Sequence, residues 1–369
     1  MGRSGPMDKP TMLDYVLETP HVLRAQLASS PASSLADIFC ADAYERMRIV
    51  ASGSSRNAAL IARPYLRAML GREVLVTEPY TFCSYECELP ANEFCFAISQ
   101  SGYSTNTLEA LAAMRGSGRL AIGITGDVSS DFKDAADVLI DYGVGEEQVG
   151  YVTKGVSALV LFLQLLGLEI AYREGRLDER ARKAELSHLA EMVRQFETAT
   201  VQARETIEGR YKELSAMKRV FFAGASANYG VGCEGALKFG ECIQIPAMAF
   251  ELDEYLHGPN LQLSPEYTVF VNAVGVSDHE RARQIVAATR LVTDHVFVLT
   301  DDPRIADADI LIEPAGPVLA RPACLLPFYQ ICAYRITEDR HLWHKHPLVA
   351  RFDAALSGKS ENYVDKEVL

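Results

Sequence analysis

The chain has 369 residues, which is too long for one typical core and sufficient for two domains. Its composition, 49% hydrophobic and 23% charged, excludes general disorder, and a formal net charge of −13 without a basic stripe argues against a nucleic-acid partner. Eight cysteines without a CxxC pair and a start, MGRSGPMDKP, without an apolar signal core favour a reduced, cytoplasmic protein.

The first part of the chain predicts a helical arm followed by an α/β unit. Residues 1–40 form the arm, helical from 11 to 40. Residues 41–176 alternate short runs rich in Val, Ile and Phe, such as EFCFAISQ and LAIGITGD, with longer amphipathic segments. This alternation is typical of a doubly wound parallel sheet. The last apolar run, VSALVLFLQLLGLEIAY, is shorter than the about 20 residues that span a bilayer, so we expect a buried helix and no membrane partner.

Three further segments complete the chain. Residues 177–217 are charged, rich in Ala and Leu and free of Pro, and we interpret them as a helical linker in the form of a hairpin. Residues 218–345 show the same alternation of apolar runs and amphipathic segments as the first unit. Residues 346–369 form a C-terminal tail, which we expect to close over the functional site.

The two α/β units repeat each other in sequence. RIVASGSSRN at 48–57 can be laid over RVFFAGASAN at 219–228, with the Arg, the Gly, a Ser and the final Asn coinciding. ADVLI at 136–140 recurs as ADILI at 308–312. The sequence therefore predicts two tandem copies of one doubly wound fold.

Hydroxyl and amide side chains gather where one strand of the first unit ends. The run FAISQSGYSTNT changes abruptly after Ile98 into small polar residues, and a helix is expected from about Thr107. Side-chain donors and free backbone N–H groups at the positive end of a helix dipole are a natural seat for a phosphate dianion. An ordinary N-capped turn uses the same residue types, so that interpretation stays open. The candidate phosphate ligands are Ser99, Gln100, Ser101 and Ser104.

A second polar turn is expected beside the first. SGSSRN at 52–57 is the same kind of strand-to-helix junction on a neighbouring strand, and it adds Ser54 and Ser55 to the candidate pocket. The second unit has AGASAN at the corresponding turn but VNAVGVSD where SQSGYS would recur. One phosphate site per chain follows.

The second unit contributes charged residues of a different kind. In CEGALKFGECIQ, Glu234, Lys238 and Glu241 are spaced four and three apart and fall on one helical face. By spacing alone they indicate surface ion pairs worth a few tenths of a kcal/mol. Further along, AFELDEYLHGPNLQL places His257 before a Gly-Pro that ends its segment, so the imidazole is held at a corner of the chain.

Taken together, these motifs resemble the sugar isomerase (SIS) family, in particular its double-domain members. Those members are related to the isomerase half of glucosamine-6-phosphate synthase and to fructosamine-6-phosphate deglycases. The resemblance covers about residues 40–345 and implies two tandem flavodoxin-like domains. It implies that the SQSG segment, with Ser54 and Ser55, binds a sugar phosphate. A further family segment matches GEEQVGYVTK at Thr153 and Lys154, with Val152 in place of the family's Ser.

The same resemblance implies roles for the second unit. Glu241 is implied to carry a proton between C1 and C2 of the open-chain sugar, with Lys238 and Glu234 nearby. His257 lies sixteen residues after Glu241, as in the family, and is implied to open the sugar ring, often from the neighbouring subunit. We therefore expect a homodimer in which His257 is shared between subunits.

The family's synthases also carry a lysine near the C-terminus that forms an imine with the sugar ketone. Here the tail reads LSGKSENYVDKEVL, so Lys359 is the better candidate and Lys366 the weaker one. If neither reaches the site, the imine has to come from the substrate's own amine. The reaction requires no cofactor and no metal, and HLWHKH, with His341, His344 and His346, is expected to be exposed and not to bind one.

The function implied by the resemblance is that of an enzyme acting on an amine-bearing hexose 6-phosphate. Two reactions fit: a fructosamine-6-phosphate deglycase, or a glucosamine-6-phosphate deaminase. A plain aldose/ketose phosphosugar isomerase is an alternative enzyme. A phosphosugar sensor is the alternative outside enzymes, although sensors do not need both Glu241 and His257. We expect no glutamine-dependent synthesis, because only about forty residues precede the first unit and no N-terminal cysteine nucleophile is present.

Overall fold

Two parallel sheets of five strands each form the frame of the molecule. The computed structural model describes residues 9–276, 279–305, 307–314, 316–344 and 346–364. The first sheet contains β1 (Arg46–Ala51), β2 (Glu73–Thr77), β3 (Glu93–Ile98), β4 (Ile122–Thr125) and β5 (Val138–Asp141), in the order β2-β1-β3-β4-β5. The second contains β6 (Arg219–Gly224), β7 (Ala247–Phe250), β8 (Tyr267–Ala273), β9 (Val296–Thr300) and β10 (Ile310–Leu311), in the order β10-β9-β8-β6-β7.

Both sheets have the strand order of a flavodoxin-like fold. Numbered within each unit, the order is 2-1-3-4-5 in both, and every pairing is parallel. The predicted fold class, two tandem doubly wound units, is confirmed. The aspartate of the repeated motif ADVLI/ADILI has the same role in both copies. Asp137 accepts a hydrogen bond from the Ala121 N–H at 2.9 Å, and Asp309 accepts one from the Val298 N–H at 2.8 Å.

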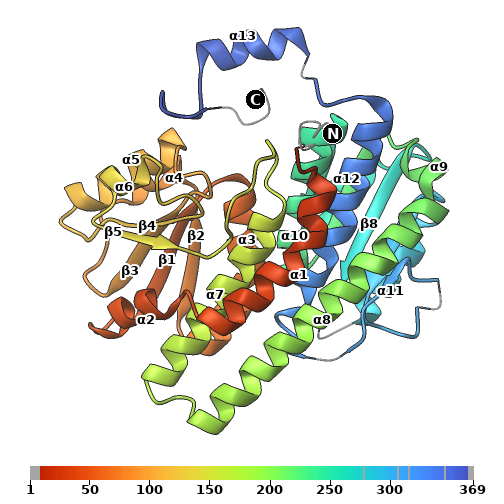
Figure 1. Ribbon diagram of the computed structural model, residues 1–369. Helices are drawn as coiled ribbons and strands as arrows, with labels where there is room; N and C mark the ends of the chain where they lie inside the picture. Colours follow the sequence, from red (N-terminus) through yellow and green to blue (C-terminus); the bar gives the residue numbers. More distant parts are fainter. Residues whose placement is uncertain (1–8, 277–278, 306, 315, 345, 365–369) are drawn as a thin grey trace, which may run out of the picture.

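Helices cover both faces of each sheet. The longer ones are α1 (Met12–Ser29), α2 (Ser33–Cys40), α3 (Gly53–Leu70), α5 (Thr105–Gly116), α7 (Lys154–Arg173), α8 (Glu179–Gly209), α10 (Ala227–Lys238), α11 (His279–Thr289), α12 (Leu326–Arg340) and α13 (Pro347–Ala355). The short ones are α4 (Pro79–Thr81), α6 (Phe132–Ala135), α9 (Tyr211–Leu214), η1 (Phe82–Glu86), η2 (Phe239–Ile243), η3 (Glu254–Leu256), η4 (Pro259–Gln262) and η5 (Arg321–Leu325). Figure 1 shows α3, α7, α1, α8, α10 and α12 running between the two sheets.

The main core lies in this central helical layer. Strand residues alternate between the faces of a sheet, and Ile49 and Phe222 belong to the core shared by both units. Their neighbours Val50 and Phe221 belong to two smaller outer cores, beneath α5 and α11 respectively. The strands therefore read as continuous apolar runs because both faces are covered.

Helix α7 is the apolar run that the sequence analysis interpreted as a buried helix, and that prediction is confirmed. By length and composition it could cross a membrane, but 94% of its most apolar window is buried inside the protein. A helix that is apolar all round is buried on all sides, and α7 packs against α1, α2, α3 and α8.

The linker is helical, but its predicted form is wrong. Residues Glu179–Gly209 form one continuous helix of 31 residues, not a hairpin. No Pro or Gly interrupts the segment before Gly209, and the Asp178 side chain caps its start by accepting a hydrogen bond from the Ala181 N–H at 2.7 Å. The actual hairpin is formed by α7 and α8.

The two units are joined where α3 crosses α10, the first helix of each unit. Gly230 of α10 lies at this crossing: a Cβ atom there would be 2.8 Å from the backbone nitrogen of Ile61 in α3. Because the opposing atom is backbone, it cannot move aside as a side chain would. The glycine therefore lets the two helices, and the residues on them, approach closely.

We predict that Gly230→Ala lowers the free energy of unfolding by about 1–3 kcal/mol, as overpacking does. Alanine is by itself the better helix former by about 1 kcal/mol, so the sign tests the packing. Gly209→Ala is the control, since no heavy atom lies within 4 Å of its added Cβ, and it should be neutral or stabilising. Urea unfolding followed by circular dichroism measures both; a gain in stability at Gly230 would contradict the close approach.

Candidate active site

A buried carboxylate links the two units at the α3–α10 crossing. Glu234 of α10 is fully buried, and both of its oxygens accept hydrogen bonds from the first unit. The Ser54 hydroxyl donates to Oε1 and the Asn57 amide donates to Oε2, each at 2.9 Å. Ser54 was predicted to bind phosphate, but here its hydroxyl holds Glu234. Ser55 follows it in α3 and is also buried.

Lys238 lies one helical turn further along α10 and is also fully buried. Its Nζ is 2.7 Å from Glu241 Oε2, 3.4 Å from Glu234 Oε1 and 3.3 Å from Ser54 Oγ. Burial lowers the pKa of Lys238, but the carboxylates of Glu234 and Glu241 outweigh it and raise that pKa above its ordinary value. The predicted grouping of the three residues is present, whereas their interpretation as surface ion pairs is wrong because Glu234 and Lys238 are buried.

Glu241 is the exposed end of this chain of charges. It lies in η2, a π-helical turn that continues α10, and 31% of its side chain is accessible. π-helical turns often occur at functional sites, and this one ends at Gln244 in a left-handed conformation. A carboxylate that is oriented by a buried ammonium on one side and open on the other can accept a proton from a bound molecule.

Residues 99–104, between β3 and α5, form a loop that we call the hydroxyl loop. It has the compact form that an anion-binding site requires. Ser99 Oγ accepts a hydrogen bond from the Gly102 N–H and lies 3.2 Å from Ser104 Oγ. Gly102 has a φ of +68°, and a Cβ there would lie 1.8 Å from Ser130 Oγ, so only glycine fits. β1 and β3 are neighbours in the sheet, and Asn106 donates to Ser52 Oγ at 2.9 Å, which ties the two predicted turns together.

Glu147 supports the loop from the far side and was missed by the sequence analysis. Its carboxylate accepts hydrogen bonds from the backbone N–H groups of Thr153 and Lys154, both at 2.8 Å, at the start of α7, and from the Gln100 amide. Burial raises the pKa of Glu147 above its ordinary value, against the lowering effect of these hydrogen bonds. The Gln100 amide lies flat on Gly155, where a Cβ would be 2.2 Å away. The only signal in the sequence for this role of Glu147 is an acidic residue a few positions before the predicted helix.

The C-terminal tail returns to the hydroxyl loop. Lys359 pairs with Ser104 in an isolated antiparallel bridge. Its Nζ donates to Ser101 Oγ at 2.8 Å and to Ser104 Oγ at 3.3 Å. Burial lowers the pKa of Lys359. Within the described residues, Lys359 makes no hydrogen bond or ion pair with Glu241 or Lys238; Lys366 lies outside these residues.

His257 is not brought to the other candidate catalytic residues within one chain. It is exposed at the corner between η3 and η4, and its backbone N–H donates to Glu254 O at 3.0 Å. Over the described ranges, no hydrogen bond or ion pair joins its imidazole to Glu241 or Lys238.

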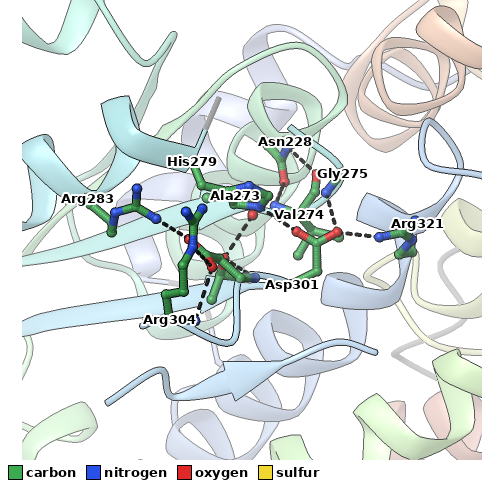
Figure 2. Close-up of polar contacts among 11 residues, drawn as sticks. Asn228, Ala273, Val274, Gly275, His279, Arg283, Asp301, Arg304 and Arg321 are labelled. Carbon is green, nitrogen blue, oxygen red and sulfur yellow. Dashed lines mark hydrogen bonds and ion pairs between the residues drawn. The ribbon is translucent and has the colours of Figure 1, made fainter. Parts of the chain in front are cut away.

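The corresponding edge of the second sheet is filled by the protein's own polar side chains (Figure 2). Asn228, the counterpart of Asn57, bonds both the C=O and the N–H of Val274 and so closes the loop after β8. Asp301 is buried and takes up the donors of that loop. Its partners are the Gly275 N–H at 2.9 Å, the His279 imidazole at 2.7 Å and the Arg321 guanidinium. The described donors of this loop are thus taken up by the protein's own side chains.

The described part of the chain contains no group of three or more His, Cys, Asp or Glu residues that could hold a metal ion. His341 and His344 are exposed, and His346 caps α13 by accepting a hydrogen bond from the Leu348 N–H.

Comparison with known proteins assigns the first unit. Residues 41–168 match the model of the SIS domain. The chain contains a SIS domain. Its second unit repeats the strand order of this SIS domain, which gives tandem SIS domains. Glutamine–fructose-6-phosphate aminotransferase (isomerizing) from Aeropyrum pernix is 28% identical over 309 residues, 80% of this chain and 48% of the relative. The SIS chain spans about half the length of the curated relatives it matches.

Solved structures agree with the tandem SIS fold. A provisionally named phosphosugar isomerase from Clostridium difficile 630 matches with a TM-score of 0.86 and 25% identity, covering 96% of this chain and 100% of that one. The C-terminal domain of glucosamine-fructose-6-phosphate aminotransferase from Francisella tularensis matches with a TM-score of 0.79 and 20% identity, covering 92% and 98%. The second likeness shows the fold alone.

We predict that Lys238→Met lowers the free energy of unfolding by about 3–5 kcal/mol, because it leaves the carboxylate of Glu234 buried beside no cation. Adding Glu234→Gln removes that uncompensated charge and should restore part of the loss. Urea unfolding of the two single variants and the double variant measures the coupling. A double variant no more stable than Lys238→Met alone would show that the buried charge is not the cause.

Proposed function

We propose that this SIS protein is an enzyme that moves a proton between C1 and C2 of an amine-bearing hexose 6-phosphate. One observation carries the proposal: the partly exposed carboxylate of Glu241 lies 2.7 Å from the ammonium of the buried Lys238. Lys238 also lies beside Glu234, whose carboxylate accepts hydrogen bonds from the first unit. The hydroxyl loop of that unit supplies neutral donors for a phosphate group. Similarity to isomerizing aminotransferases and to a phosphosugar isomerase supports this substrate class.

In the deglycase form of the reaction, the Glu241 carboxylate accepts a proton from C1 of the bound fructosamine 6-phosphate. The resulting enaminol is protonated at C2 by the same carboxyl, which leaves an imine at C1. Water adds to the imine and releases glucose 6-phosphate and the free amine. Lys238 orients the carboxylate between the two carbons and donates to it throughout. In the deaminase form, the nitrogen is on C2 throughout: the Glu241 carboxylate accepts the C2 proton and returns it to C1, and water hydrolyses the resulting C2 imine to fructose 6-phosphate and ammonia.

His257 enters this proposal through a second copy of the chain. It is exposed and, within the ranges that the structure describes, has no partner among the catalytic candidates of its own chain, as a residue that serves a neighbouring subunit would be. We therefore propose a homodimer in which His257 of one protomer transfers the proton that opens the sugar ring in its partner. A phosphosugar sensor would need neither this residue nor Glu241 and its buried lysine.

Glu241→Gln should reduce turnover by at least about 10²-fold, because an amide cannot accept the C1 proton. Binding of a hexose 6-phosphate, measured by calorimetry, should change little, since the phosphate donors are in the other unit. Glu208→Gln, an exposed carboxylate on α8, is the matched control and should retain full activity. Unchanged turnover in Glu241→Gln would refute the assigned base.

The reaction itself is decided by a proton NMR time course with fructoselysine 6-phosphate and glucosamine 6-phosphate in one tube. Deglycase activity gives glucose 6-phosphate and free lysine together. Deaminase activity gives fructose 6-phosphate alone. If neither substrate changes, the same tube is given fructose 6-phosphate, and its conversion would identify a plain isomerase; no change in any of them would leave the sensor.

A further inference from the structure

The ammonium of Lys359 contacts the hydroxyl loop and lies 5.1 Å from the centroid of the Tyr363 ring, but it has no ionic partner among the described residues. The hydroxyl groups of Ser99, Ser101 and Ser104 line the candidate phosphate site, and all three are neutral. Lys359 is partly buried, and among the described residues no carboxylate forms an ion pair with it. Removing an ammonium from water without a counter-charge is unfavourable, and burial lowers its pKa for the same reason.

The tail that carries Lys359 is anchored on both sides of it. The Thr105 N–H donates to Gly358 O at 3.2 Å, and the Ser360 N–H donates to Tyr103 O at 2.9 Å. Further on, Asn362 donates to the Asp131 carboxylate at 2.9 Å. The backbone contacts place Nζ over the loop independently of its own hydrogen bonds, so its position is determined by the tail as a whole.

We propose that Lys359 is the cationic phosphate ligand of this site and not an imine-forming lysine. This inference rests on the proposed function for the identity of the substrate as a sugar phosphate. A phosphate that accepts hydrogen bonds from Ser101 and Ser104 lies beside Nζ, and it supplies the negative charge that the ammonium lacks. Over the described part of the chain, no other lysine or arginine donates to Ser99, Gln100, Ser101 or Ser104.

The same geometry separates Lys359 from the chemistry at the other end of the sugar. C6, which carries the phosphate, is at the opposite end of a hexose from C1 and C2. A lysine bonded to the phosphate donors is therefore on the wrong end of the substrate to attack the carbonyl carbon. Lys359 is then not the source of an imine nitrogen, and a sugar phosphate that carries its own amine is the class of substrate that we propose for this site.

The test measures binding of glucitol 6-phosphate, which has the phosphate but no carbonyl and so cannot form an imine. Calorimetry should show that Lys359→Met weakens this binding about 10- to 100-fold, the range expected for a charge-assisted hydrogen bond. Lys359→Arg should restore most of it, because a guanidinium keeps the charge and binds phosphate. Unphosphorylated glucitol should bind equally weakly to all three proteins.

Turnover and trapping complete the test. Lys359→Arg should keep substantial activity, whereas this substitution would abolish activity if Lys359 formed the imine. Borohydride reduction in the presence of fructose 6-phosphate should leave the peptide containing Lys359 unmodified. Unchanged glucitol 6-phosphate binding in Lys359→Met, failure of Lys359→Arg to restore it, or a sugar reduced onto Lys359 would overturn the assignment. Because binding is measured directly, a protein without catalytic activity would refute the proposed function and leave this inference standing.

Discussion

The buried carboxylate of Glu234 is the constraint on which the rest of the site depends. A charged group inside a protein is tolerated only if its oxygens are hydrogen-bonded and its charge is balanced. Here the hydrogen bonds come from Ser54 and Asn57 of the first unit, and the charge comes from Lys238 of the second. The two units therefore cannot slide past one another without breaking this arrangement, and the close crossing at Gly230 allows it to form. Lys238 in turn orients the carboxylate of Glu241 through their ion pair.

The two copies of the fold have diverged in how they use the same edge of the sheet. In the first copy, Asn57 reaches outward to Glu234 and the hydroxyl loop keeps its small polar side chains. In the second copy, Asn228 turns inward and ties the loop after β8, while Asp301 takes up the loop's N–H and the Arg321 guanidinium (Figure 2). A donor set that is satisfied by the chain itself is not available to an external anion. This is the physical basis for expecting one phosphate site per chain.

The tail adds a positive charge at the phosphate end of the proposed chemistry. A seat of neutral hydroxyls suits a protein with a net charge of −13, but it leaves a phosphate dianion without a counter-charge. Lys359 brings one positive charge to that seat from the far end of the chain, and the tail residues around it are bonded to the same loop. If the lysine serves the phosphate, the second unit needs only a base that reaches C1 and C2, and Glu241 is oriented for that work by a residue that is itself fully buried.

The sequence by itself determined the duplication, both doubly wound units, the polar run after Ile98 and the grouping of Glu234, Lys238 and Glu241, because each depends on local periodicity or repeated motifs. It could not show that Glu234 and Lys238 are buried, since spacing on a helix is the same whether the helix faces water or another unit. It did not predict Glu147, whose role comes from the contact of its carboxylate with N–H groups at the start of α7. It took the linker for a hairpin although its composition suits one long helix. The reach of Lys359 to Ser101, across 258 positions of chain, was decided by tertiary structure alone, because no local pattern encodes a contact between distant segments.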